Sequence, residues 1–401
     1  MNDIEQGLPV PPGQRVPHQD WDRAPWNRWT FQRVREYVPT TEVWRGSGPV
    51  RRLERNSQDL GGIEFGEADG QKSTLQQWID SSYTDAILLL HHGAIVLEQY
   101  HNGMDERTLH LSQSMAKSVV GVVAGILIGR GLLDPSQQVT HYLPELAVTA
   151  WQGATLQQVM DMTTGVRYVE DYEALDSDIA ITDIASGWKQ PRPGFPTPPC
   201  IWEQILTLTE QVREHGEKFH YRSIETDVLA HCLQRVTATR LAELVSRELW
   251  QPLGCEESAN FTVDPAGYSL ACGGLNATLR DYARFGQLLL QQGRLDANQL
   301  VPADWIADIH NADHSLFGKP YTQAAPNGGY RNQFWIEDVD RPGFMARGVF
   351  GQLIYVDPAT DLVMVKLSSW PEFTSVPRLI TALNAIHAIG DRLNAQAVPH
   401  Q

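Results

Sequence analysis

Strand-like sequence occurs near both ends of this chain, and the sequence between the two regions is helical. Residues 86–90 and 94–100 are apolar, β-prone runs joined by a short link that contains Gly93. Residues 351–356 and 362–368 form a second such pair around a turn at 357–361. One antiparallel sheet would therefore take its strands from both ends of the chain. In the intervening sequence apolar residues recur at helical spacing in several segments, namely 114–133, 156–162, 203–213, 223–236, 241–249 and 279–292.

This order predicts an α/β (α+β) fold, in which an antiparallel sheet is flanked by helices and interrupted by a large α-helical insertion. We expect residues 1–110 to form an N-terminal wrap and the first part of the α/β domain, and residues 111–275 to be mainly helical. Residues 276–401 would complete the sheet, with a last helix over 374–395 packed on it. The first 50 residues contain seven prolines and four tryptophans, which favours an ordered segment lying over the body.

Composition excludes several classes of partner and site. The net charge of -16 leaves no basic field for nucleic acid or an anionic membrane. The longest apolar run, 119–128, is far shorter than the ~20 residues that a membrane span needs. The cysteines are far apart and indicate neither a zinc site nor a disulfide framework, and residues 1–14 do not resemble a secretory signal. We therefore expect a cytoplasmic protein without a metal or cofactor, which is monomeric or a homodimer.

The segment Ser114-Met115-Ala116-Lys117 matches the S-x-x-K pattern at the start of an apolar helix. A serine at a helix start can offer its backbone N–H to an oxyanion, and a lysine one turn later lies on the same face. We expect burial in this helix to lower the pKa of Lys117 toward that of a useful base. The alternative is a helix cap at Ser114 and an exposed charge at Lys117.

Ser186-Gly187-Trp188-Lys189 matches the same pattern, so the motif alone decides nothing. Gly187, Pro191 and Pro193 follow Ser186 and do not allow a helix to continue, whereas Ser114 precedes a helical run. Context therefore favours Ser114 as the nucleophile. The chain has no G-x-S-x-G, H-E-x-x-H or phosphate-binding glycine motif, which leaves α/β-hydrolase, zinc protease and nucleotide hydrolase interpretations without support.

From about residue 27 to 370 the chain resembles the serine β-lactamase and penicillin-binding-protein superfamily, in its esterase-like branch, and most closely the 6-aminohexanoate-dimer hydrolases (nylon-oligomer amidases). The ordered segments that carry the resemblance are 114–117, 160–165, 170–172, 186–188, 219–223, 280–284, 348–352 and 366–370. The resemblance implies a β-lactamase-like fold and an acyl-enzyme mechanism without a cofactor.

Two further motifs of the superfamily are present in altered form. Tyr221-Arg222-Ser223 stands in the place of Y-x-N, so that Tyr221 would shuttle a proton and Ser223 replaces the asparagine. Val349-Phe350-Gly351 stands in the place of K-T-G and lacks its lysine and threonine, which predicts poor penicillin hydrolysis. The resemblance also implies that the backbone N–H groups of Ser114 and Gln352 form the oxyanion hole. A buried, merely structural role is the alternative for Tyr221.

The resemblance implies further substrate-binding residues in the stretch from 171 to 188. Tyr172 and Trp188 would border the substrate, and Asp183 would pair with a substrate ammonium. Cys272 and Gly351 would lie at the same pocket. The alternatives are a solvated acidic face for Asp183 and plain packing for Cys272.

These observations together predict a serine amidohydrolase that acts on a small molecule, with linear amides of the 6-aminohexanoate-dimer type as substrates. A carboxylesterase for short-chain esters, with weak or no β-lactamase activity, is the alternative. A third interpretation, from another class, is a catalytically idle binding or sensor protein that keeps the fold.

Overall fold

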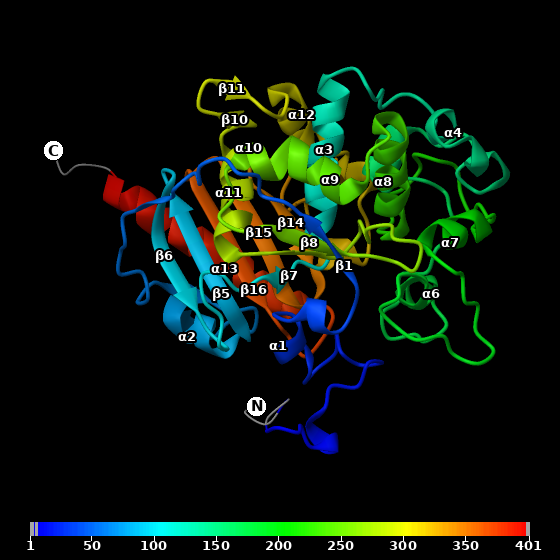
Figure 1. Ribbon diagram of the computed structural model, residues 1–401. Coiled ribbons are helices and arrows are strands. Elements are labelled where there is room, and N and C mark those ends of the chain that lie inside the picture. Colours follow the sequence, from blue (N-terminus) through cyan, green and yellow to red (C-terminus); the bar gives the residue numbers. More distant parts are fainter. Residues whose placement is uncertain (1–3, 5–6, 398–401) are drawn as a thin grey trace.

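An eight-stranded sheet forms the centre of the computed structural model, which describes residues 4 and 7–397 (Figure 1). Neighbouring strands are antiparallel, except that β2 pairs with β6 in parallel. In spatial order the strands are β12 (Gly329–Arg331), β13 (Phe334–Ile336), β14 (Phe344–Gly348), β15 (Gln352–Asp357), β16 (Leu362–Ser368), β5 (Thr84–His91), β6 (Ala94–Tyr100) and β2 (Glu54–Arg55).

Both predicted hairpins are confirmed, as β5–β6 and β15–β16. Strands β16 and β5 pair directly, with Val365 opposite Leu88, so the two ends of the chain meet in the middle of one sheet. Every residue of β5 is buried. Leu88 contributes to the core on one face and Leu89 to the core on the other. This explains why the strand is a continuous apolar run and does not alternate.

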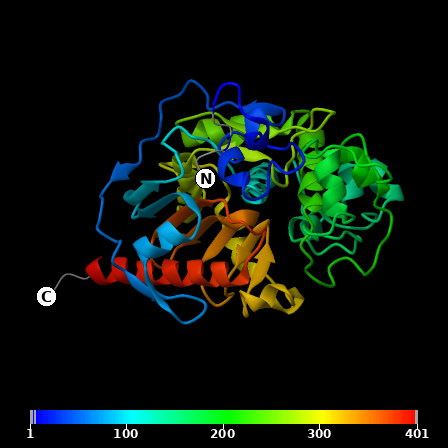
Figure 2. The ribbon, with the colours of Figure 1, turned by 90° about the horizontal axis from the view of Figure 1, so that it is seen from below.

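Helices cover both faces of the sheet. α13 (Val376–Ala397) and α2 (Leu75–Ser81) pack on one face, and Figure 2 shows α13 running along it. α11 (Leu279–Leu290) lies against the opposite face, where Gly286 permits close approach because a Cβ there would lie 2.5 Å from Val363. The predicted C-terminal helix is therefore confirmed, as is the helix predicted over 279–292.

The helical region between the sheet halves contains α3 (Met115–Gly129), which is buried on all sides over most of its length. Figure 1 shows α4, α6 and α7 on the side away from the sheet. The shorter helices, most of them in this region, are α1 (Asn27–Thr30), α4 (Val139–Tyr142), α5 (Leu156–Met160), α6 (Asp178–Ala185), α7 (Ile201–Thr207), α8 (Ile224–Thr237), α9 (Leu241–Val245), α10 (Gln251–Leu253) and α12 (Ala303–Asp308).

The helix predicted over 203–213 is wrong in its second half. α7 ends at Thr207, and the chain then continues without helix to an isolated bridge between Gln211 and Val166. Backbone N–H groups of Ala150 and Arg167 donate to the carbonyls of Leu208 and Glu210. Pairing with these segments satisfies the backbone groups that a longer helix would have used.

A second sheet was not predicted, because its strands are too short to show a pattern. Its order is β1 (Thr40–Val43), β8 (Ala259–Thr262), β9 (Leu275–Ala277) and β7 (His110–Leu111). It joins the N-terminal segment to the residues just before Ser114. Two small hairpins complete the strands, β3 (Glu64–Gly66) with β4 (Lys72–Thr74), and β10 (Arg294–Leu295) with β11 (Asn298–Gln299).

The N-terminal segment lies on the body, as expected. Trp21 is fully buried and its indole N–H donates to the carbonyl of Trp188 at 3.0 Å. The amide of Asn27 donates to the carbonyl of Trp370 at 2.8 Å. No helix in the described part of the chain combines the length and apolarity needed to cross a membrane. The predicted domain boundaries at 110 and 275 stay a prediction.

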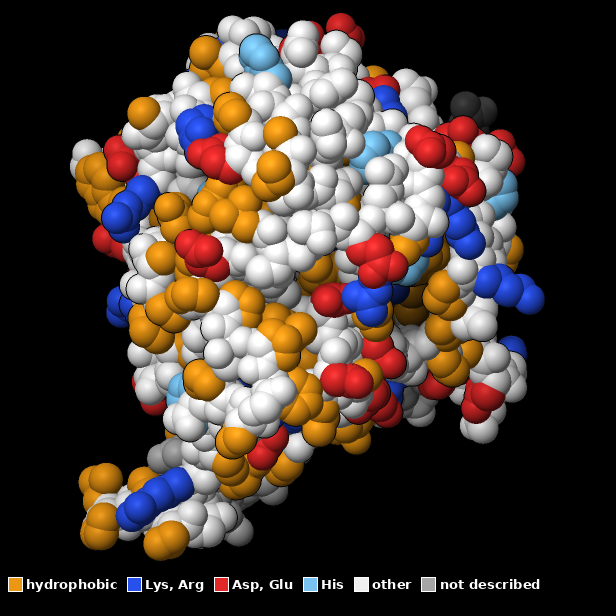
Figure 3. Space-filling model, turned by 90° about the vertical axis from the view of Figure 1, so that its right-hand side faces the viewer, with side chains coloured by type: hydrophobic (Ala, Val, Ile, Leu, Met, Phe, Trp, Pro, Cys, Tyr) orange, Lys and Arg blue, Asp and Glu red, His pale blue; other side chains and the backbone are white. Residues whose placement is uncertain are grey.

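The face of the molecule on the helical side carries acidic and basic side chains intermixed, with no continuous basic patch (Figure 3). This distribution agrees with the acidic net charge of the chain.

Candidate active site

Ser114 lies at a strand–turn–helix junction. Strand β7 ends at Leu111, the backbone N–H of Ser112 donates to Leu275, and α3 begins at Met115. Between them Gln113 has φ +49°, a left-handed conformation that is uncommon for a residue with a Cβ. This sharp turn places the Ser114 side chain at the cavity while its backbone stays buried.

The structure brings Lys117 to Ser114, as the spacing predicted. The Lys117 Nζ donates to Ser114 Oγ at 2.8 Å and to the carbonyl of Cys272 at 2.7 Å. Lys117 is only 1% exposed. The bond to Cys272 helps to hold the lysine in place, since a buried ammonium group needs several acceptors to replace its water shell.

The expectation that the pKa of Lys117 is lowered is wrong. Burial lowers this pKa, but Glu170 and the ionised forms of Tyr221 and Cys272 raise it more, so that it lies above its ordinary value. The apolar helix supplies the burial that we predicted, and groups from three other segments reverse its effect. Lys117 is therefore an ammonium ion at neutral pH.

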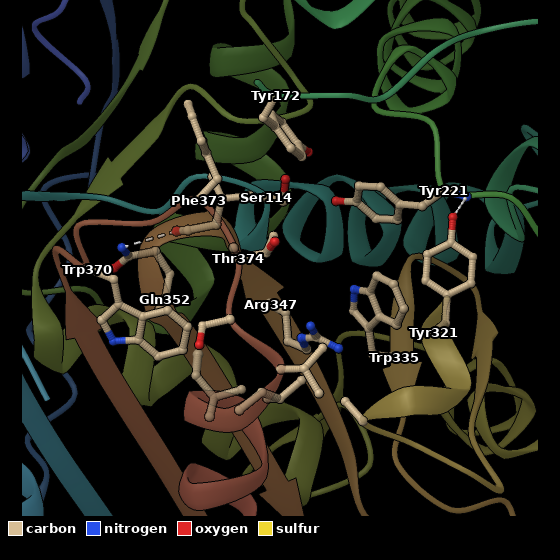
Figure 4. Close-up of a pocket in the computed structure, with 18 of the residues that line it drawn as sticks. Ser114, Tyr172, Tyr221, Tyr321, Trp335, Arg347, Gln352, Trp370, Phe373 and Thr374 are labelled. Atoms are coloured by element: carbon tan, nitrogen blue, oxygen red, sulfur yellow. Dashed lines mark hydrogen bonds between the residues drawn. The ribbon is translucent and has the colours of Figure 1, made fainter. Parts of the chain in front are cut away.

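Tyr221 reaches Ser114 from the segment before α8. Its hydroxyl points toward Ser114 in Figure 4, and the Lys117 Nζ lies 5.1 Å from the centroid of its ring. The ring stacks on Trp335 with centroids 5.3 Å apart, and the backbone N–H donates to Tyr321 Oη. Burial raises the pKa of Tyr221, although Lys117 lowers it, so the phenol is protonated at neutral pH.

Ser223, which replaces the motif asparagine, is bonded to a carboxylate. Its hydroxyl donates to Glu170 Oε1 at 2.5 Å and its backbone N–H to Glu170 Oε2 at 2.7 Å. The hydroxyl of Tyr172 also donates to Glu170, at 2.6 Å. Sequence reasoning missed Glu170, although it lies two residues before Tyr172. It lines the cavity and makes the wall beside Tyr172 acidic.

The turn between β14 and β15 packs against the nucleophile segment. A Cβ at Gly348 would lie 2.5 Å from the carbonyl oxygen of Ser112, so only glycine allows this approach. Gly351 has φ +85°, and a Cβ there would lie 2.2 Å from the Trp370 ring. The side chain of Gln352 is bonded twice to the backbone of Ser368, at 2.6 and 3.1 Å, which holds the start of β15 in place.

A cavity of about 480 Å³ opens at Ser114. Tyr172, Tyr221, Gly351 and Gln352 all line it. Sequence reasoning missed most of the other lining residues, among them Glu170, Trp335, Arg347 and Lys366. Figure 4 shows Tyr221 and Trp335 on one side of Ser114, and Tyr172 and Arg347 on opposite sides of it.

Three predicted substrate-binding residues do not line this cavity. Trp188 is 5% exposed and donates to Thr262 Oγ1 at 3.0 Å. Cys272 is buried, and only its carbonyl contacts the catalytic group, through Lys117. Asp183 lies on α6, and burial together with nearby Asp22 raises its pKa to about 7.

Tyr172 and Phe373 stack face to face, with ring centroids 5.3 Å apart, and both line the cavity. The guanidinium of Arg23 lies 4.9 Å from the Phe373 ring centroid and donates to the carbonyl of Tyr172. The N-terminal segment therefore holds this aromatic pair in position.

The rival Ser186–Lys189 pair does not form a site. Ser186 ends α6, and its hydroxyl donates to the carbonyl of Asp183 at 3.0 Å. The Lys189 ammonium forms an ion pair with Asp22. Ser186 therefore caps a helix and Lys189 belongs to a structural ion pair, so the two do not act as a nucleophile and its partner. In the described ranges no cluster of three or more histidine, cysteine or carboxylate side chains is arranged to hold a metal ion.

Comparison with known proteins places this geometry in a family. The Beta-lactamase family model matches residues 75–388. The chain is 35% identical, over 88% of each chain, to the 6-aminohexanoate-dimer hydrolase of Paenarthrobacter ureafaciens. A Bacillus anthracis structure, provisionally named as a 6-aminohexanoate-dimer hydrolase, superposes with a TM-score of 0.88 at 29% identity, covering 97% of this chain and all (100%) of that one.

A structure of a family VIII carboxylesterase shares the fold more distantly. Its TM-score is 0.58 at 16% identity, and the match covers 77% of this chain and 92% of that one. The family match, the 35% identical relative and the contact between Ser114 and Lys117 agree with one another. This chain therefore belongs to the β-lactamase family and is a serine hydrolase with a β-lactamase-like fold.

Proposed function

We propose that this enzyme hydrolyses linear amides of the 6-aminohexanoate-dimer type through an acyl-enzyme on Ser114. The observation that carries the proposal is the 2.8 Å contact of Lys117 Nζ with Ser114 Oγ, beside the Tyr221 phenol. The relative named as a 6-aminohexanoate-dimer hydrolase supports the substrate class.

The reaction starts from the form in which the Lys117–Tyr221 pair has lost one proton. Ser114 Oγ forms a bond to the substrate carbonyl carbon and passes its proton to this pair. The backbone N–H groups of Ser114 and Gln352 hold the oxyanion. When the C–N bond breaks, Tyr221 returns the proton to the leaving nitrogen, because an amine leaves only when protonated. Water then adds to the acyl carbon and passes one proton to the Lys117–Tyr221 pair. The bond between Ser114 Oγ and the acyl carbon breaks, Oγ takes up that proton, and the carboxylic acid leaves.

Asp183 lies outside the cavity wall, behind the end that Glu170 makes acidic, and we propose it as a further partner for the free ammonium of such a substrate. It stands with Asp22 and Glu170 in an acidic environment, which disfavours a further negative charge and favours a cation. Lys189 offsets part of this environment through its ion pair with Asp22. No side-chain partner of Asp183 lies within hydrogen-bonding distance in the part of the chain that the structure describes.

Esters are the second candidate substrates, and the cavity favours them as additional substrates. Its wall is rich in aromatic and aliphatic side chains, namely Tyr172, Tyr221, Tyr321, Trp335, Trp370, Phe373, Leu353, Leu379 and Ala382. An ester needs no protonated leaving group, so the same site can hydrolyse it. Penicillins are poor substrates, because Val349 and Phe350 replace the charged and hydroxyl groups of the third motif.

Covalent labelling tests the proposal. A fluorophosphonate should form an adduct at Ser114, and an idle binding protein would form none. Ser114→Ala should lose turnover of amide and ester by a factor on the order of 10⁴ or more. Ser186→Ala is the matched control, because its hydroxyl only caps α6, and it should keep most activity. Near-normal turnover by Ser114→Ala would contradict the mechanism.

We further propose that the protein works in the cytoplasm, as a monomer or homodimer and without nucleic acid. All four cysteines are buried and unpaired, which suits a reducing compartment. Cell fractionation tests the location, and light scattering of the purified protein measures the oligomeric state.

A further inference from the structure

Arg347 is a cation in the cavity wall for which the described chain provides no anion. It lies near the end of β14, opposite Leu353 of β15, and its side chain is half-buried. The guanidinium carbon lies 4.6 Å from the Trp335 ring centroid. Trp335 in turn stacks on Tyr221. Arg347 is thus held by an aromatic contact next to the catalytic tyrosine.

Other buried arginines in the described chain have carboxylate partners. Arg222 lies 3.3 Å from Glu225, and Arg284 lies 2.9 Å from Asp281. Arg347 forms no ion pair with any residue in the described ranges. Burial lowers its pKa to about 10, and Tyr221 is the only group that raises it. A cation removed from water without a counter-ion is costly, so an anionic ligand would be stabilised here.

The two sides of the cavity differ in charge. Glu170 lines it beside Tyr172, whereas Arg347 lies on the other side of Ser114 (Figure 4). The cavity wall also includes Trp335, which Arg347 contacts, and two aliphatic residues of α13, Leu379 and Ala382. A linear molecule with an amine at one end, methylene groups between and a carboxylate at the other end matches this distribution.

We propose that Arg347 binds the carboxylate of the leaving half of the substrate. The inference rests on the proposed amide hydrolysis and makes it more specific: the leaving amine is the nitrogen of an ω-amino acid whose carboxylate is free. A guanidinium suits this task because it can donate two parallel hydrogen bonds to one carboxylate. Arg347 would then orient the scissile bond by holding the far end of the chain.

The test compares N-(6-aminohexanoyl)-6-aminohexanoate with the 6-aminohexanoyl amide of hexylamine, in which a methyl group replaces the carboxylate. The readout is the ratio of kcat/KM for the two substrates. Arg347→Met should lower this ratio about 10- to 150-fold, equivalent to about 1.5–3 kcal/mol for hydrogen bonds to a charged group. Arg347→Lys keeps the charge but loses the planar fork, and should lower the ratio less. The matched control is Arg341→Met, since Arg341 is 61% exposed, lies outside the cavity wall and should leave the ratio unchanged.

A second measurement separates this inference from the proposed function. Hexanoate and hexylammonium are tested as inhibitors of p-nitrophenyl acetate hydrolysis. Arg347→Met should raise the inhibition constant of hexanoate selectively, by the same 10- to 150-fold. If the wild type cleaves the ester but neither amide, the proposed function fails, and the hexanoate comparison still decides the role of Arg347. An unchanged inhibition constant together with an unchanged substrate ratio would overturn the inference. Should Arg347→Met not fold, as judged by thermal melting, the same comparison is made with Arg347→Lys.

Discussion

Replacing Gly351 with alanine tests whether the turn before Gln352 sets the catalytic rate. Gly351 has φ +85°, which costs alanine about 1 kcal/mol. The new Cβ would lie 2.2 Å from Trp370, well inside the contact distance of about 3.5 Å, so the turn or the ring has to move by about 1 Å. A shift of this size costs about 100-fold in rate, and the loss of one oxyanion donor costs about 100- to 1,000-fold. We therefore expect kcat for p-nitrophenyl acetate to fall about 100-fold.

Gly131→Ala is the matched control for the backbone cost. Gly131 also has a positive φ, +69°, but nothing lies within 4 Å of its added Cβ. This variant should lose about 1 kcal/mol of stability and keep its kcat. Thermal melting and ester kinetics of both variants separate the two effects. Equal kcat values for Gly351→Ala and Gly131→Ala would refute the assignment of the turn to the oxyanion hole.

Three further predictions concern proton transfer and substrate charge. Tyr221→Phe removes the hydroxyl that protonates the leaving amine, so amide hydrolysis should fall at least tenfold more than hydrolysis of p-nitrophenyl acetate. Equal losses on both substrates would mean that Tyr221 only shapes the pocket. The pKa values of Lys117 and Tyr221 are both raised, so the enzyme form in which this pair has lost one proton is scarce at neutral pH. We therefore expect kcat/KM to rise from pH 6 to pH 9, and a plateau already reached at pH 6 would contradict this. Asp183→Asn should lower kcat/KM about 5- to 150-fold for substrates with a free amine and little for their N-acetyl analogues, and identical behaviour of the two would favour the esterase alternative.

The contact between Ser114 and Lys117 could be predicted because it depends on local structure alone. Residues three apart on a helix lie on one face, and the apolar run after Lys117 identifies the helix. The two hairpins could be predicted for the same reason, since their strands are adjacent in sequence. Tyr221 and Gln352 lie far from Ser114 in sequence, and only the family resemblance pointed to them.

The charge states could not be predicted, because they depend on groups that tertiary structure brings together. The apolar helix around Lys117 indicates a lowered pKa, whereas Tyr221, Cys272 and Glu170 raise it. Similarly, Ser223 stands in the place of an asparagine, and only the folded chain shows that its hydroxyl donates a hydrogen bond to Glu170. The local sequence pattern predicts which side chains are buried, but it does not predict which charged groups lie next to them in the folded chain.

Arg347 illustrates the same limit for substrate binding. Ala346 and Met345 beside it are buried on opposite faces of β14, so an arginine at the next position would ordinarily be placed at the solvent-exposed end of a strand. In the folded chain the guanidinium lies over the ring of Trp335 of β13, and α13 supplies apolar residues to the wall of the same cavity. These elements come from different parts of the sequence, and none of them carries a recognisable motif. The proposed nucleophile is therefore encoded locally, whereas the proposed binding of a substrate carboxylate depends on contacts that exist only after the two halves of the sheet have joined.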